Sequence, residues 1–158
     1  DVGLSGAIAV IPPDGKPIVC DIPTLTLEKS RRVHDVIGMR GLLEMIKRIG
    51  HDKIIAVVEH VHAMPVSGRV ALFGMGRSLG TIEGVLGCLD IPFELVSPQK
   101  WKKAILGGMA KGKESSLLKA RQLFPSASLT RKKDDGRAEA LLLAVYGKRF
   151  FNDPPCPI

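Results

Sequence analysis

The sequence predicts an α/β fold with a five-stranded mixed sheet and helices on both faces. Three short apolar runs open the chain with tight reversals between them, which favours an antiparallel meander. Helical and strand-like segments then alternate, as they do when parallel strands are joined by crossover helices. With 158 residues, the chain is close to the length of one domain. We expect a single domain over residues 1–150 and a tail at 151–158.

The first half of the chain supplies the meander and one helix. Residues 6–11 form an apolar run that ends at Pro12-Pro-Asp-Gly-Lys-Pro17, a strong turn sequence. Residues 18–22 predict a second strand, and the alternation over 24–28 predicts a third. Apolar residues then recur at helical spacing from Val33 to Ile49.

The second half alternates strands and helices. Residues 53–58 form a continuous buried-strand pattern that ends in Glu59. The elements expected after it are a glycine-broken helix over 76–89, a strand over 93–96, and helices over 114–124 and 136–150. Because crossovers are right-handed, the strand over 53–58 should lie parallel beside the first strand.

Composition limits the class of protein. Hydrophobic residues make up 45% of the chain and charged residues 25%, which is typical of a globular protein. No apolar run approaches the roughly 18 residues of a membrane helix, so no membrane partner is expected. Cys20, Cys88 and Cys156 form no C-x-x-C pair. This excludes a disulfide framework and a cysteine-type zinc site, and it fits a reducing compartment.

The net charge of +7 is unevenly distributed. Residues 61–158 hold fifteen Lys and Arg against eight Asp and Glu, which accounts for the whole excess. Ten basic residues and one acidic residue, Glu114, lie between Lys100 and Lys133. Such a block attracts polyanions, nucleic acid first. The alternative is an ordinary solvated helix face.

Four acidic residues stand where a charge needs an explanation. Glu59 closes an apolar strand, and burying it is costly unless it is paired or binds a cation; the alternative is that it emerges into solvent. Asp135 and Glu139 are four residues apart and share a helix face, although an acid at this place also favours a helix N-terminus. Asp1 precedes the first strand, and we expect it to lie inside a longer strand that begins before this sequence.

Together these acids predict a metal site. Four carboxylates brought to one place repel each other unless divalent cations hold them together. Oxygen-only ligands point to Mg²⁺ or Mn²⁺ rather than to zinc. Asp134 competes with Asp135 for the place beside Glu139, and helical geometry favours Asp135.

The motifs around these acids resemble those of the RuvC-type Holliday junction resolvases, which have the ribonuclease H-like fold. They are Asp1-Val-Gly-Leu-Ser-Gly-Ala-Ile-Ala-Val10, Ile54-Ile-Ala-Val-Val-Glu59, Pro98-Gln-Lys-Trp-Lys102, and Lys132-Lys-Asp-Asp-Gly-Arg-Ala-Glu139 with the apolar residues after it. The branch most similar contains the plastid resolvase and its bacterial and phage relatives. The chain departs from the pattern at Val2, where many members carry Pro, and at Gly136, where the partner of the final acid normally stands.

The resemblance implies a structure-selective DNA endonuclease that nicks opposing strands of a Holliday junction symmetrically during homologous recombination. It implies two Mg²⁺ ions per active site, with Mn²⁺ as a substitute, held by Asp1, Glu59, Asp135 and Glu139. Lys102 would neutralise phosphate charge at the scissile bond. Two alternatives stay open: another ribonuclease H-like nuclease acting on RNA–DNA hybrids or flaps, and a non-catalytic four-way-junction-binding protein.

The resemblance also implies a DNA-binding surface and a homodimer, because a four-way junction is two-fold symmetric. The DNA-binding residues expected are Lys102, Lys113, Phe73, Gly74, Met75, Arg77, Lys132 and Lys133. For Phe73 the alternative is a place in the core at the start of a helix. The helix around 81–89, rich in small residues, could supply the dimer interface. We expect the protein beside DNA, in a chloroplast nucleoid or in bacterial or phage cytoplasm, and not secreted.

Overall fold

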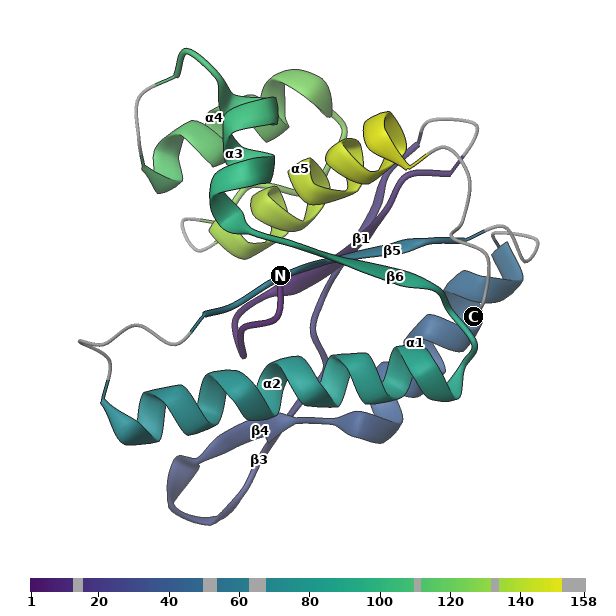
Figure 1. The fold of residues 1–158 in the computed structure, drawn as a ribbon, viewed down its shortest axis with the longest axis vertical. Coiled ribbons are helices and arrows are strands. Elements are labelled where there is room, and N and C mark those ends of the chain that lie inside the picture. Colours follow the sequence, from purple (N-terminus) through teal and green to yellow (C-terminus); the bar gives the residue numbers. More distant parts are fainter. Residues whose placement is uncertain (13–15, 50–53, 63–67, 110–111, 132–133, 152–158) are drawn as a thin grey trace.

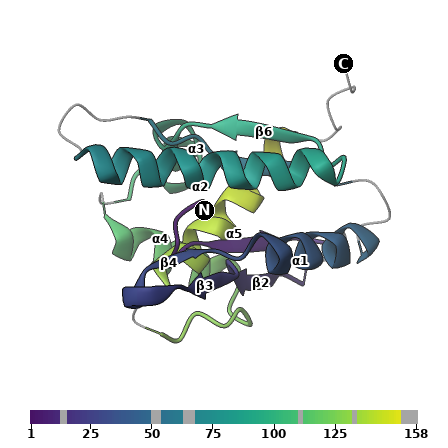
Figure 2. The same ribbon diagram turned by 90° about the horizontal axis from the view of Figure 1, so that it is seen from below.

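A computed structural model describes residues 1–12, 16–49, 54–62, 68–109, 112–131 and 134–151. The expected turn at 13–15, the two lysines at 132 and 133, and the tail at 152–158 lie outside these residues. The elements are β1 (Ala7–Val10), β2 (Ile18–Asp21), β3 (Thr24–Thr26), β4 (Arg32–His34), α1 (Val36–Ile49), β5 (Ala56–Glu59), α2 (Arg69–Cys88), β6 (Phe93–Val96), α3 (Pro98–Leu106), α4 (Lys113–Leu123) and α5 (Asp135–Phe150). Figures 1 and 2 show their arrangement.

The strands form three separate ladders among the described residues. β1 pairs with β2 and β3 with β4, both antiparallel, whereas β5 pairs with β6 in parallel, with Glu59 opposite Val96. The antiparallel pairing of the first two expected strands and the β5–α2–β6 crossover are therefore confirmed. The three-stranded meander is wrong, because β3 pairs with β4 and not with β2. Among the described residues no ladder joins β1 to β5, so the five-stranded sheet and the placement of the strand over 53–58 beside the first strand are wrong as well.

Helix α5 contacts strands of two different ladders. It packs against β1, β2 and β5, and α3, α4 and α5 lie on the opposite side of β5 and β6 from α2 (Figure 1). A Cβ on Gly147 would lie 2.7 Å from Cγ2 of Val57, so the helix backbone rests directly on β5. Strands of three or four residues form few ladder hydrogen bonds, and packing against α5 decides their places.

Three element boundaries differ from expectation. The helix expected from Val33 begins at Val36, because residues 32–34 form β4 and Asp35 accepts a hydrogen bond from the Gly38 N–H at 2.9 Å. Helix α2 begins at Arg69, seven residues before the expected start. Helix α3 was not expected, although Ser97 caps it and Pro98 occupies its first position, a common way for a helix to begin.

The core has two parts, and β5 contributes to both. Val58 is buried with apolar residues of α1 and α2, such as Met39 and Ile82, while Val57 packs among the residues around α5. Neighbouring residues of a strand point to opposite faces, so this short strand joins the two parts. The second part centres on Trp101 and on α5.

Replacing Gly147 tests the contact between α5 and β5. We expect Gly147→Ala to lower the free energy of unfolding by roughly 1–2 kcal/mol, because the added methyl meets the branched side chain of Val57. Gly41→Ala in α1 is the matched control, since nothing lies within 4 Å of its added Cβ. The control should raise stability by about 0.5–1 kcal/mol. Urea denaturation measures both changes, and an equal gain in the two variants would contradict the packing of α5 on β5.

Candidate active site

The start of α5 brings Asp1 toward Glu139. The Asp1 carboxylate accepts a hydrogen bond from the Gly3 N–H at 3.2 Å, and its other oxygen lies 3.1 Å from the place a Cβ on Gly136 would take. The same Cβ would lie 2.5 Å from the Ser5 carbonyl oxygen. Gly136 therefore lacks a side chain because the segment before β1 occupies that space.

Glu59 stands at the end of β5 and is half-buried. Its Oε2 accepts a hydrogen bond of 2.8 Å from the indole N–H of Trp101, which is 0% exposed. The alternative in which Glu59 simply emerges into solvent is therefore wrong. Sequence reasoning did not single out Trp101, although it is the one tryptophan in the chain and stands beside Lys102 in the motif.

Glu139 lies one turn into α5 and has two donors. Nζ of Lys102 lies 2.7 Å from its Oε1, and the hydroxyl of Ser116 donates to the same oxygen at 3.3 Å. Lys102 thus comes to the acids, as expected, from helix α3. Ser116 is 1% exposed and was missed, because a serine three residues beyond Lys113 carries no distinctive signal in the sequence.

Two neighbouring residues of α3 link Glu59 to Glu139. Trp101 donates a hydrogen bond to Glu59, and Lys102 forms an ion pair with Glu139. Asp1 lies beside the first turn of α5, because its carboxylate approaches Gly136. In both Figure 1 and Figure 2 the start of the chain lies beside α5.

The donor set suits a hard divalent cation. Asp1, Glu59 and Glu139 offer carboxylate oxygens, which Mg²⁺ and Mn²⁺ prefer. Within the described ranges no three His, Cys, Asp or Glu side chains are close enough to hold one ion. Glu59 is bonded to Trp101, and Glu139 is paired with Lys102. Asp135 begins α5 one turn before Glu139, and its place as a metal ligand stays a prediction.

Asp134 has a structural role, which decides between the two neighbouring aspartates. It is 0% exposed, and its carboxylate accepts hydrogen bonds of 2.7 Å from the backbone N–H and from Nε of Arg131. Arg131 and Arg137 also bind Asp21 on β2. These ion pairs attach the segment before α5 to the β1–β2 hairpin and occupy Asp134, leaving Asp135 as the candidate ligand.

Apart from Lys102, the described residues expected to contact DNA lie on α2 and α4. Phe73, Gly74, Met75 and Arg77 belong to α2 rather than to a loop, and all but Met75 are exposed. Phe73 is 74% exposed, so the alternative that places it in the core is wrong. Lys113 is the first residue of α4. Lys132 and Lys133 lie outside the described residues.

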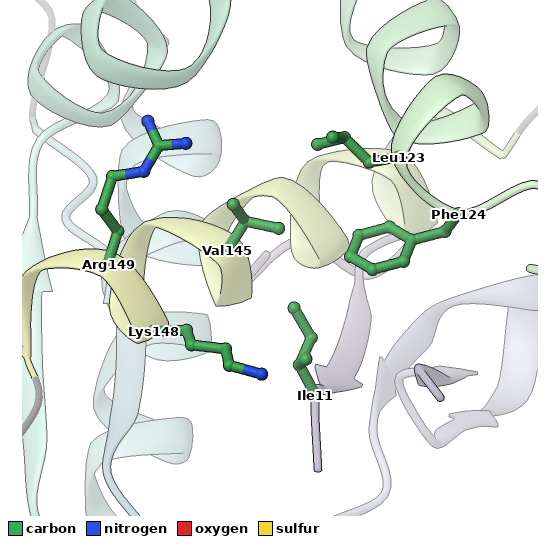
Figure 3. Close-up of a pocket in the computed structure, with 6 residues that line it drawn as sticks. All are labelled: Ile11, Leu123, Phe124, Val145, Lys148 and Arg149. Atoms are coloured by element: carbon green, nitrogen blue, oxygen red, sulfur yellow. The ribbon is translucent and has the colours of Figure 1, made fainter. Parts of the chain in front are cut away.

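A pocket of about 450 Å³ lies away from the acids (Figure 3). It is lined by Ile11, Leu123, Phe124, Val145, Lys148 and Arg149. Val145 is six residues beyond Glu139, which is roughly 9 Å along the helix. No carboxylate lines the pocket, and hydrolysis of a phosphodiester by a divalent cation needs carboxylate ligands. We therefore place the candidate site at the acids and not in this pocket.

Comparison with known proteins agrees with this geometry. The fold is that of RuvC: a Thermus thermophilus RuvC in complex with a Holliday junction substrate matches with a TM-score of 0.57 and 14% identity, over 95% of this chain and 90% of that chain. A second T. thermophilus RuvC structure matches with a TM-score of 0.54 and 16% identity, over 95% and 99%. In sequence, the chain is 31% identical over 126 residues to the chloroplastic Holliday junction resolvase MOC1 of Chlamydomonas reinhardtii.

These matches confirm the resemblance to the RuvC-type Holliday junction resolvases. The alignment with MOC1 covers 73% of this chain, and this chain spans only 14% of that protein's length. No family model matches the sequence. None of the helices in the described part of the chain has the length and apolar character needed to cross a membrane.

Neutralising Asp134 and Asp135 separately tests their assignment. We expect Asp134→Asn to lower the free energy of unfolding by roughly 1.5–3 kcal/mol, because a buried carboxylate loses charge-assisted bonds to Arg131. Asp135→Asn should cost at most about 1 kcal/mol, the value of an acid in the first turn of a helix. Chemical denaturation gives both values, and the reverse ranking would contradict the assignment.

The ion pairs of Asp21 predict a pH dependence of stability. Hydrogen bonds from Arg131, and then from Arg137, hold the Asp21 pKa well below its ordinary value of 3.8. Because the Asp21 pKa is lower in the folded than in the unfolded protein, the ionised carboxylate stabilises the fold at any pH above the unfolded-state pKa. This contribution is lost as the pH falls toward the folded-state pKa. The stability difference between the wild type and Asp21→Asn should be constant from pH 7 to 5 and shrink below about pH 4. Since Asp21 is half exposed, we expect about 1 kcal/mol or less, and a difference that grows with acidification would contradict the pairing.

Proposed function

We propose that this chain is a divalent-metal-dependent endonuclease that resolves Holliday junctions by nicking opposing strands symmetrically. The observation that carries the proposal is the set of contacts around α3 and α5: Trp101 and Lys102, neighbours on α3, contact Glu59 and Glu139, and Asp1 lies against Gly136 at the start of α5. The RuvC fold and the similarity to a chloroplastic Holliday junction resolvase support the same activity. Resolution of junctions would serve homologous recombination.

The four acids would hold the metal. Asp1, Glu59, Asp135 and Glu139 would bind two Mg²⁺ ions, with Mn²⁺ as a substitute, which supply activation of water and stabilisation of the leaving 3′ oxygen. Such a site needs carboxylates from different segments of the chain, and the acids proposed here come from the start of the chain, β5 and α5. Glu59 ends β5, and Asp135 and Glu139 lie on α5, so three of the four stand on regular elements, which favours exact placement.

Lys102 has a defined task in this proposal. Its Nζ neutralises Glu139 at 2.7 Å in the absence of DNA, while its side chain is 39% exposed. A phosphate diester at the site would compete with Glu139 for this charge. Lys102 would then lie between the acids and the DNA backbone. There its positive charge would offset the negative charge that grows as the phosphodiester bond breaks.

The substrate implies a wider surface. Lys100 and Lys103 are exposed on α3 beside Lys102, and basic side chains of this kind bind DNA phosphates. On α2, the exposed Phe73 and Arg77 would reach the junction centre, where an aromatic side chain can wedge into an opened base step. Lys113, Lys132 and Lys133 complete the predicted DNA contacts.

The two-fold symmetry of a junction calls for a homodimer. The outer side of α2 offers an interface: Gly80, Gly84 and Gly87 recur at intervals of three and four residues and are exposed. This spacing puts them on one face of the helix, and the lack of side chains lets a second helix approach closely. We place the homodimer contact there. The similarity to a chloroplastic resolvase favours a chloroplast nucleoid over a bacterial or phage cytoplasm.

Cleavage assays test the proposal. A labelled mobile four-way junction, a matched linear duplex and an RNA–DNA hybrid are incubated with the protein in Mg²⁺ and in EDTA. We expect paired symmetric nicks on the junction alone, lost in EDTA and reduced at least about 100-fold in Asp1→Asn and Glu59→Gln. The control is Glu44→Gln, which removes a carboxylate from the exposed ion pair with Arg40 on α1 and should leave cleavage intact.

Two outcomes would support the alternatives instead. Tight junction binding with no nicks in Mg²⁺ or Mn²⁺ would indicate a non-catalytic junction-binding protein. Cleavage of the hybrid with no preference for the junction would indicate another ribonuclease H-like nuclease. Either result would overturn the proposed resolvase activity.

A further inference from the structure

Two buried donors reach the candidate metal ligands from outside the acid set. The indole of Trp101 donates to Glu59 at 2.8 Å, and the hydroxyl of Ser116 donates to Glu139 at 3.3 Å. Trp101 is 0% and Ser116 is 1% exposed. Neither side chain can therefore exchange its partner for bulk water, and neither is placed to touch DNA from the surface.

The bond from Trp101 to Glu59 joins two rigid elements. Glu59 stands opposite Val96 in the β5–β6 ladder, and the backbone N–H of His60 donates to the Val96 carbonyl at 2.9 Å. The backbone N–H of Trp101, as distinct from its indole, donates to the Ser97 carbonyl. Only Ser97, which caps α3, and the first turn of that helix separate the β5–β6 ladder from the Trp101 indole. A buried indole has one donor and no acceptor, and its choice of a carboxylate gives a charge-assisted bond.

The same logic applies to Glu139. Ser116 comes from α4, which packs along α5, so its hydroxyl is fixed by helix packing. Lys102 shares the acceptor oxygen of Ser116, but its side chain is more exposed and can leave for phosphate. Within the described part of the chain, the hydrogen bonds to each glutamate fall on one oxygen, Oε2 in Glu59 and Oε1 in Glu139. The second oxygen of each glutamate is the one we assign to a cation.

We propose that Trp101 and Ser116 are positioning residues that hold Glu59 and Glu139 in the orientation required to bind the divalent cation. The inference rests on the proposed function and adds to it two residues that do not touch metal or DNA. Hydrogen bonds to ligating carboxylates commonly change metal affinity by 10–100-fold. A Glu side chain without such a bond samples several rotamers and meets the cation less often.

Metal binding without DNA gives the direct test. Trp101→Phe keeps an aromatic ring in the core and removes the N–H donor together with part of the indole ring system, so its effect is compared with that of a second core variant. We expect Trp101→Phe to weaken Mn²⁺ binding by about 10–100-fold in isothermal titration calorimetry. Ile105→Val is the matched control, because Ile105 is buried on the same helix and in the same part of the core. It should lower the melting temperature without changing Mn²⁺ affinity.

Ser116 provides a second arm that does not depend on replacing the tryptophan. We expect Ser116→Ala to weaken Mn²⁺ binding by about tenfold, and Ser116→Thr, which keeps the hydroxyl, to restore it. Trp101 is the one tryptophan in the chain, so its fluorescence reports paramagnetic Mn²⁺ bound nearby in the wild type and in both Ser116 variants. The midpoint of quenching should shift with the calorimetric affinity.

The outcomes separate this inference from the proposed function. Unchanged Mn²⁺ affinity in Trp101→Phe and in Ser116→Ala, with junction cleavage by the wild type, would overturn the inference and leave the resolvase standing. A loss of affinity in Ile105→Val equal to that in Trp101→Phe would also overturn it, because core packing would then explain both. A wild type that neither binds Mn²⁺ nor nicks junctions would overturn the proposed function as well. Weaker binding confined to Trp101→Phe and Ser116→Ala supports the inference.

Discussion

Helix α5 is buried along most of its length, and the places of the candidate acids depend on how closely other segments can approach it. Two glycines permit the approach: Gly136 lies against the Asp1 carboxylate and the Ser5 carbonyl, and Gly147 lies against Val57 of β5. Close packing of this kind tolerates little added volume. The same helix therefore sets the start of the chain and the end of β5 on either side of Glu139.

Bringing acids together in a buried place creates a charge that the surroundings must offset. Glu59 accepts a hydrogen bond from Trp101. Glu139 forms an ion pair with Lys102 and accepts a hydrogen bond from Ser116. Asp134, which is fully buried, is instead paired with Arg131. A buried carboxylate is stable only with such partners. The ion pairs of Asp134 attach the segment before α5 to its neighbours, while the bonds to Glu59 and Glu139 come from side chains of α3 and α4.

Much of the fold and part of the site could be predicted because the signals are local. Hydrophobic periodicity indicated α1 and α5, turn residues indicated the β1–β2 hairpin, and motif spacing singled out Glu59, Lys102 and Glu139. Helix α3 was not predicted, because Ser97-Pro98 directly follows β6 and is as typical of the end of a strand as of the start of a helix. The sheet was overestimated because strand patterns do not state their partners, and the short strands here are arranged by contacts with α5.

The sequence by itself determined the residue types, their order and their periodicity, and with them the resemblance to the RuvC-type resolvases. Only the tertiary structure decided that Asp134 serves the fold and that Trp101 and Ser116 serve the acids. Local spacing cannot distinguish Asp134 from Asp135, since both stand at the start of one helix. Their difference comes from Arg131 and from β2, which meet Asp134 only when segments far apart in the chain are packed together.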